Sequence, residues 1–159
     1  MPALKPVRAS RGFTLVEVMV VMVIMGIVLG MVSLNAIPSP RQNLQNEAQR
    51  LALLLQLARD EAIVRNRLVA FEATPDSYRF MVRNEVRWDP ITQDDLLRER
   101  PFKNAPLTLL LDPPAEGLGV PMRITFGREP VDKPFVLTLA VGEDRVSIRA
   151  DGIGHFVVD

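Results

Sequence analysis

A long apolar run near the N-terminus limits what this chain can fold into more than any other feature. No charged residue occurs between Val18 and Leu34, and the preceding residues 1–12 carry only basic charges. As an α-helix with a rise of about 1.5 Å per residue, residues 13–37 would extend roughly 37 Å. The hydrocarbon core of a bilayer is about 30 Å thick. The sequence therefore predicts a single-pass transmembrane helix over residues 13–37, with the basic N-terminus in the cytoplasm.

A cleaved secretory signal peptide is the alternative interpretation of this run. The apolar region of such a peptide is typically shorter, and its cleavage site requires small residues at two alternate positions. Leu34-Asn35-Ala36 places leucine where a small residue is needed. Both criteria favour a membrane anchor over a cleaved secretory signal peptide.

Glu17 is a carboxylate at the beginning of the predicted membrane helix. A charge within a bilayer costs on the order of 2.5–3.5 kcal/mol, and such residues usually mark function. In the simplest interpretation Glu17 is hydrated at the cytoplasmic boundary, about 6 Å along the helix from Phe13. Cleavage after Gly12 would instead create a cationic amine on Phe13, which could neutralise the carboxylate within one helix or between neighbouring helices.

The motif Gly-Phe-Thr-Leu-Val-Glu at residues 12–17, followed by a long apolar helix, resembles the class III signal of type IV pilins and type II secretion pseudopilins. The resemblance implies that a prepilin peptidase removes residues 1–12 as a leader peptide. The cut falls between Gly12 and Phe13, and the peptidase then N-methylates Phe13. Glu17 is implied to pair with the N-terminus of an adjacent subunit and to guide assembly.

Gly26 and Gly30 stand four residues apart within the apolar run. This Gly-x-x-x-Gly spacing allows close helix packing in a membrane. Glycine is also frequent in membrane helices in general. The resemblance adds a third reading, because the centre of this helix is locally loosened in assembled pilin-like fibres.

A second helical pattern follows Pro38 and Pro40, which end or kink the membrane helix. Apolar residues recur at 4-3-4-3-4 spacing, which predicts an amphipathic helix over residues 43–66. The apolar positions are Leu44, Ala48, Leu51, Leu55, Ala58 and Ala62, and the outer positions are Gln45, Gln49, Arg59 and Arg65. The short stripe favours packing on the chain's own globular domain over an autonomous coiled coil. By resemblance, residues 38–66 form the second half of a spine helix.

From Leu68 onward the hydrophobic period changes to two, which predicts a β-rich domain over residues 67–159. A hairpin is expected around residues 73–77. The expected strands are residues 68–72, 78–82, 107–111, 122–126, 135–141, 146–150 and 153–158, the last three forming an antiparallel meander. The order of elements therefore indicates an α+β fold. The resemblance implies that it is pilin-like, with a long N-terminal α-helix, membrane-spanning in its first half, packed on an antiparallel β-sheet or β-sandwich.

Residues 84–104 are expected to form a long connecting loop that contains Trp88. Tryptophan is enriched at interfaces, so Trp88 could centre a partner-binding surface. A tryptophan half-buried over the sheet is the alternative.

The composition favours a structural or binding protein over an enzyme. The chain has no cysteine and a single histidine, His155, so histidine-based acid–base catalysis would rest on one residue. It also lacks a phosphate-binding glycine loop and metal-ligand spacing. We therefore predict no catalytic residues, no cofactor and no metal site.

Segments 58–66, 134–139 and 151–154 look like those of the H-type minor pseudopilins of type II secretion and the related FimT/FimU minor pilins. The resemblance implies a subunit at or near the tip of the pseudopilus that helps to drive folded exoproteins across the outer membrane. The implied partners are the prepilin peptidase, the other minor pseudopilins, the major pseudopilin, the inner-membrane assembly platform and secreted exoproteins. The implied location is the bacterial inner membrane, with the C-terminal domain in the periplasm.

Two alternatives stay open. The first is a FimT/FimU-like minor pilin of a type IV pilus, acting in motility or DNA uptake. Without its leader the chain carries 16 basic and 19 acidic residues, a balance that does not favour nucleic acid as a partner. The second is a signal-anchored periplasmic binding module that never polymerises.

Overall fold

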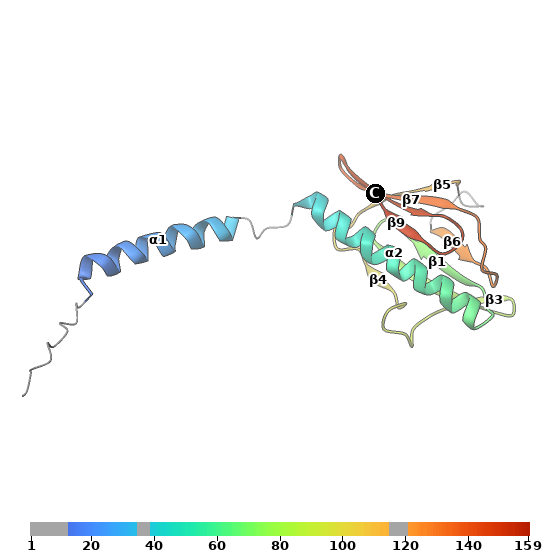
Figure 1. Cartoon of the computed structure of the whole chain (residues 1–159). Helices are drawn as coiled ribbons and strands as arrows, with labels where there is room; N and C mark the ends of the chain where they lie inside the picture. Colours follow the sequence, from blue (N-terminus) through green and yellow to red (C-terminus); the bar gives the residue numbers. More distant parts are fainter. Residues whose placement is uncertain (1–12, 35–38, 115–120) are drawn as a thin grey trace, which may run out of the picture. The chain divides into compact units, whose positions relative to one another are not determined.

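The computed structural model of the chain describes residues 13–34, 39–114 and 121–159. The chain divides into two compact units, Met1–Pro38 and Ser39–Asp159 (Figure 1). Each unit is described by itself.

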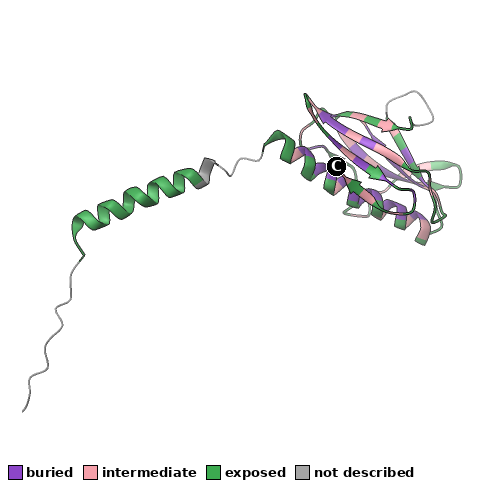
Figure 2. Cartoon of the chain, turned by 45° about the horizontal axis from the view of Figure 1, so that its top comes forward, coloured by how far each residue is buried: buried purple, intermediate pink, exposed green. Residues whose placement is uncertain are grey.

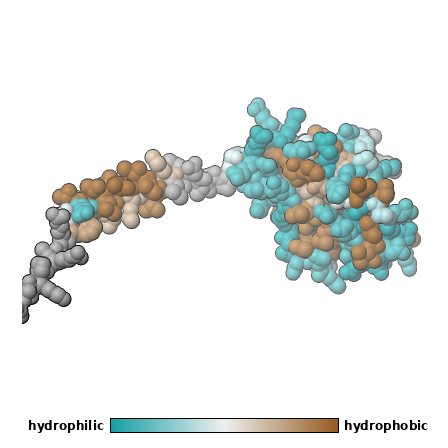
Figure 3. All heavy atoms as spheres, viewed as in Figure 1, coloured by the Kyte–Doolittle hydropathy of each residue, from teal (hydrophilic) through white to brown (hydrophobic). Residues whose placement is uncertain are grey.

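The first unit contains helix α1, Leu15–Leu34. Thr14 caps it, because the backbone N–H of Glu17 donates to Thr14 Oγ1 at 3.3 Å. Side chains 13–31 are exposed, and Figure 3 shows hydrophobic residues over almost the whole visible surface of this helix. Among the residues that the structure describes, no helix combines the length and hydropathy needed to cross a membrane.

The second unit begins with helix α2, Pro40–Val64. Ser39 is its N-cap, with its hydroxyl accepting from the Gln42 N–H at 3.2 Å, and Pro40 occupies the first turn, where no amide donor is needed. This cap explains why α2 begins three residues before the predicted start at residue 43. The predicted apolar stripe is buried along one face of the helix (Figure 2).

Sheet A contains strands β1 (Val69–Ala73), β2 (Ser77–Asn84), β3 (Arg87–Pro90), β4 (Arg100–Pro101) and β6 (Met122–Phe126). The strand order is β3-β2-β1-β6, and β4 also pairs with β2. The predicted hairpin is confirmed, because β1 and β2 pair antiparallel from Val69 with Val82 to Ala73 with Tyr78.

Sheet B contains strands β5 (Thr108–Asp112), β7 (Phe135–Val141), β8 (Asp144–Ala150) and β9 (Phe156–Val158). The strand order is β5-β7-β8-β9, and all pairs are antiparallel. The predicted C-terminal meander is confirmed, but its last strand begins at Phe156 rather than at residue 153. The N–H groups of residues 153–155 instead donate to Asp151 in a turn. Gly142 has a φ of 58° in the β7–β8 turn, a left-handed conformation that glycine adopts without steric cost.

The hydrophobic core lies between α2 and the inner faces of both sheets (Figure 1). Leu55, Phe71, Phe80, Leu137 and Ile148 are fully buried there. Complete burial of such a side chain contributes about 1.5–3 kcal/mol, so this core supplies the main stabilisation of the second unit.

The loop predicted over residues 84–104 is wrong in two places, because β3 and β4 lie within it. Glu85 has a φ of 54°, which makes the tight turn that returns the chain as β3. Further on, Leu97 and Phe102 are 1% and 3% exposed and attach this segment to the core. Strands β3 and β4 are too short and too polar for an alternation of apolar and polar residues to be recognised in the sequence.

Candidate functional site: the N-terminal segment and the surfaces of the second unit

Of the predicted processing residues, Gly12 lies outside the described residues, whereas Phe13 is described and 75% exposed. Glu17 lies in the first turn of α1. Its backbone N–H is held by Thr14, so residues 14–17 form the Thr-x-x-Glu pattern of a capping box. A carboxylate in this turn also interacts favourably with the helix dipole. This local role is compatible with the predicted role in assembly, which stays a prediction.

Gly26 and Gly30 both face open space, since a Cβ atom added at either position would meet nothing within 4 Å. A second helix could therefore approach α1 closely along these residues. The helix-packing role stays a prediction.

Arg59 is predicted to lie on the outer face of α2, and this prediction is wrong. Its side chain is 9% exposed and donates a hydrogen bond to the carbonyl oxygen of Pro130. Gly154 packs against the guanidinium group from another side, so closely that a Cβ atom added at Gly154 would lie only 2.7 Å from Arg59 Nη1. The helix period cannot reveal this burial, because the β6–β7 and β8–β9 connections that enclose Arg59 come much later in the chain.

Glu72 forms a buried ion cluster that the sequence did not predict. Its side chain is 2% exposed and accepts from Arg79 Nε at 2.8 Å and from Arg123 Nε at 2.9 Å. Burial alone raises the pKa of Glu72, but the hydrogen bonds and charges of Arg123 and Arg79 hold it below its usual value of 4.5. The predicted hairpin brings Glu72 near Arg79. Arg123 lies on another strand, 51 residues from Glu72, and hairpin pairing does not reveal it.

Trp88 is half-buried, as in the second of the two predicted interpretations. It pairs with Arg83 between β2 and β3, so the two side chains lie on the same face of sheet A. The guanidinium carbons of Arg83 and Arg123 lie 5.9 Å and 5.2 Å from the centre of its ring. These distances fit cation–π interactions.

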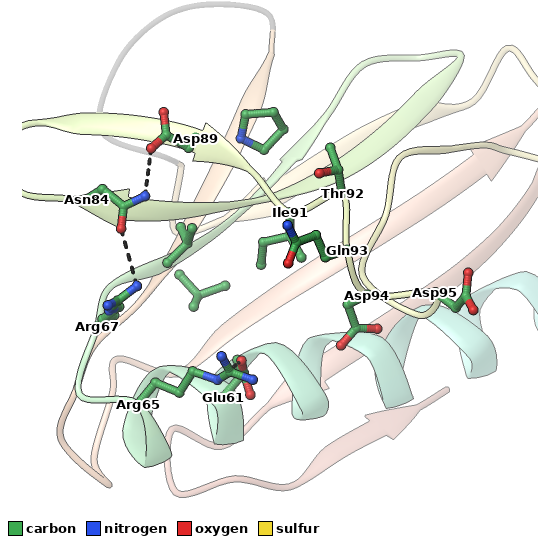
Figure 4. Close-up of a pocket in the computed structure, with 13 residues that line it drawn as sticks. Glu61, Arg65, Arg67, Asn84, Asp89, Ile91, Thr92, Gln93, Asp94 and Asp95 are labelled. Carbon is green, nitrogen blue, oxygen red and sulfur yellow. Dashed lines mark hydrogen bonds and ion pairs between the residues drawn. The ribbon is translucent and has the colours of Figure 1, made fainter.

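A polar groove of about 660 Å³ lies between the end of α2 and the β3 edge of sheet A (Figure 4). On one wall Glu61 pairs with Arg65 at 2.5 Å. Across the groove, Arg67 donates to Asn84, which donates to Asp89 at 2.6 Å (Figure 4). Acidic and basic groups are mixed here, so the groove favours neither an anion nor a cation.

His155 and Asp151 form a local motif in the β8–β9 connection. Asp151 Oδ1 accepts from the backbone N–H groups of Ile153, Gly154 and His155, and Oδ2 lies 2.6 Å from His155 Nδ1. Desolvation raises the pKa of Asp151, but the hydrogen bonds from Ile153 and His155 together lower it to about 2. Asp151 is thus a turn residue that organises the β8–β9 connection. Within residues 13–34, 39–114 and 121–159, no group of three or more His, Cys, Asp or Glu residues is placed to hold a metal ion.

An apolar N-terminal helix and an α+β unit with one helix packed on antiparallel sheets define a pilin-like protein. Residues 7–33 match the prokaryotic N-terminal methylation motif. Residues 47–154 match the family described as type II transport protein GspH. The chain belongs to this GspH family, and the predicted resemblance to H-type minor pseudopilins is confirmed.

Curated relatives agree with this family. The chain is 36% identical to type II secretion system protein H of Pseudomonas aeruginosa over 86% of its own length and 79% of the relative's. It is 28% identical to type II secretion system protein H of Aeromonas hydrophila, covering 92% of this chain and 91% of the relative.

Two solved structures share the fold. The solution structure of E. coli GspH matches with a TM-score of 0.59 at 20% identity, over 75% of this chain and 89% of that one. The minor pseudopilin EpsH from the type 2 secretion system of Vibrio cholerae matches with a TM-score of 0.53 at 17% identity, over 70% and 92%. These likenesses confirm the pilin-like α+β fold.

Proposed function

We propose that this chain is a minor pseudopilin subunit of the type II secretion pseudopilus, at or near its tip. There it helps to drive folded exoproteins across the outer membrane. The observation that carries the proposal is the presence, in one chain, of the methylation motif at residues 7–33 and the GspH match at residues 47–154. A pseudopilin family implies association with other pseudopilins, and the composition points to a structural subunit rather than an enzyme.

The N-terminal segment acts in processing and anchoring. A prepilin peptidase removes residues 1–12, cuts between Gly12 and Phe13, and methylates the new amine. Residues 13–37 then hold the subunit in the inner membrane, residues 38–66 continue the spine, and residues 67–159 form the periplasmic domain. The apolar run supports this anchoring role, because its charged residue, Glu17, lies in the first turn of α1.

Glu17 neutralises the methylated amine of a neighbouring subunit during assembly. Two charges that would each be costly in the membrane then form a pair. Contact with the major pseudopilin, the other minor pseudopilins and the assembly platform follows this step. Close packing of α1 along Gly26 and Gly30 would bring the helices together.

The assembly role is tested by co-expressing the full chain with a prepilin peptidase and the other pseudopilins. We expect Glu17→Ala to be cleaved and methylated normally, as shown by the mass of the N-terminal peptide, but to co-purify poorly with the other subunits. Glu17→Asp is the matched control and should retain part of the association. Normal co-purification of Glu17→Ala would contradict the proposed role of Glu17.

The FimT/FimU-like minor pilin and the signal-anchored binding module predict other outcomes. A minor pilin would associate with type IV pilus subunits rather than with pseudopilins. An anchored module would show no dependence on Glu17. The GspH match and the relatives named type II secretion system protein H favour the pseudopilus over both.

A further inference from the structure

The outer face of sheet A carries a fixed set of charged and aromatic side chains. Strand register pairs Glu72 with Arg79 and with Arg123, and it pairs Arg83 with Trp88. Successive side chains on a strand point to opposite faces. Because Phe71 belongs to the core against α2, the neighbouring Glu72 and its partners face away from α2. We call Glu72, Arg79, Arg83, Trp88 and Arg123 the arginine–tryptophan face.

Glu72 fixes two arginines without using all of their donors. Its oxygens accept from Arg79 and Arg123, whose side chains remain 43% and 42% exposed. Each guanidinium has five N–H donors. Arg79 and Arg123 therefore keep N–H donors that face solvent, while Glu72 already holds both side chains in position.

Trp88 adds an apolar surface between the cations. Arg83 and Arg123 approach its ring at 5.9 Å and 5.2 Å, so the ring and both guanidinium groups order one another. Ordered side chains lose less conformational entropy when a partner binds. Tryptophan and arginine are also the residue types that dominate binding hot spots.

Positive charge continues from this face into a neighbouring hollow of about 810 Å³ through Arg83, which belongs to both. The charged residues that line the hollow are Arg67, Arg83, Arg87, Arg128 and Glu85. Together the face and the hollow hold six arginines and two glutamates, whereas the chain without its leader has 16 basic and 19 acidic residues. Positive charge is thus concentrated on this side of an otherwise acidic chain.

We propose that the arginine–tryptophan face is a docking surface for an acidic segment of a partner protein. Arginine guanidinium groups match carboxylates in two-point hydrogen bonds. Within the chain, Arg79 and Arg123 each direct Nε and one Nη to a single oxygen of Glu72, so their remaining Nη donors are the ones that a partner can meet. Carboxylates of the partner bind Arg79, Arg83 and Arg123, and an apolar side chain beside them packs on Trp88. This docking goes beyond membership of a pseudopilus, and it holds whether or not the chain enters a fibre.

A protein segment fits the charge pattern better than a nucleic acid does. Duplex DNA presents one negative charge about every 1.7 Å along its axis, and an acidic chain repels such a polyanion outside the cationic patch. A short acidic segment brings only the few carboxylates that the face can pair.

Trp88 makes the test direct, because it is the only tryptophan in the chain. The full chain in detergent micelles is titrated with a tryptophan-free peptide of glutamates flanking two phenylalanines. The control peptide carries glutamine in place of every glutamate. We expect a saturable change in Trp88 fluorescence with the acidic peptide, weaker binding at high salt, and no change with the control peptide.

Variants locate the site. Arg83→Gln removes a cation beside Trp88 and leaves both Glu72 pairs in place, so it should fold normally and bind about fivefold more weakly. Arg145→Gln removes the same charge from exposed Arg145 on β8 and should bind like the unchanged chain.

Three results would overturn the proposal. The first is an absence of response to the acidic peptide at millimolar concentration. The second is equal binding of the acidic and control peptides, or equal effects of Arg83→Gln and Arg145→Gln. The third is stronger competition by a single-stranded oligonucleotide of equal charge, which would assign the face to nucleic acid.

Discussion

Removing the two arginines around Glu72 should destabilise the second unit more than removing Glu72 itself. Glu72 is 2% exposed, whereas Arg79 and Arg123 are 43% and 42% exposed. The double variant Arg79→Gln/Arg123→Gln leaves a buried carboxylate without cationic partners, which costs about 3–5 kcal/mol. Glu72→Gln leaves two arginines that water can solvate, so we expect a loss of about 1 kcal/mol.

The two variants should also differ in their dependence on pH. In the unchanged chain the pKa of Glu72 is lowered, so its contribution is present above the unfolded pKa near 4.5 and is lost as the pH falls through the lower, folded pKa. In the double variant only burial remains, which raises the folded pKa of Glu72. That variant should therefore be least stable at neutral pH and should recover stability as the pH falls.

Urea unfolding of the full chain, followed by Trp88 fluorescence at pH 7 and pH 4, measures both effects. The matched control Arg87→Gln/Arg145→Gln removes two charges from exposed positions and should change the unfolding free energy by less than about 0.5 kcal/mol. The reasoning would be refuted if Glu72→Gln were the more destabilising change, or if the double variant lost stability on acidification like the unchanged chain.

Three further changes test the packing. Leu55→Ala should cost about 2–5 kcal/mol of unfolding free energy in urea, because Leu55 is fully buried, and a loss under 1 kcal/mol would contradict its place in the core. Gly152→Ala should lower the thermal midpoint, since its φ is 82° and an added Cβ atom would lie 2.3 Å from the carbonyl oxygen of Asp132; an unchanged midpoint would contradict that contact. Ser39→Ala should cost about 1 kcal/mol by removing the cap that accepts from Gln42, and Ser39→Asp should retain most of the stability.

Much of the fold could be predicted because its signals are local. The stripe from Leu44 to Ala62 follows the helix period, and the strands after Leu68 alternate with a period of two. The N-terminal motif at residues 12–17 is likewise a continuous run of sequence. The Thr-x-x-Glu pattern at residues 14–17, which marks a helix start, is part of the same run.

The residues that sequence reasoning missed depend on contacts between distant segments. Arg59 looks like an outer helix position until the connection containing Pro130 encloses it. Glu72 looks like an outward-facing strand residue, and its burial requires Arg123 from another strand of sheet A. Strand β3 is short and polar, and it forms because the turn at Glu85 returns the chain beside β2.

The central claim is that this chain works as a subunit of the type II secretion pseudopilus. A clean deletion of its gene in the source bacterium, scored for exoprotein release and for twitching motility, tests it most directly. We expect exoproteins to remain in the periplasm while motility is unchanged, and a plasmid copy of the gene should restore release. Normal secretion with lost motility or DNA uptake would contradict the claim and assign the chain to a type IV pilus, and no change in either would indicate the anchored module.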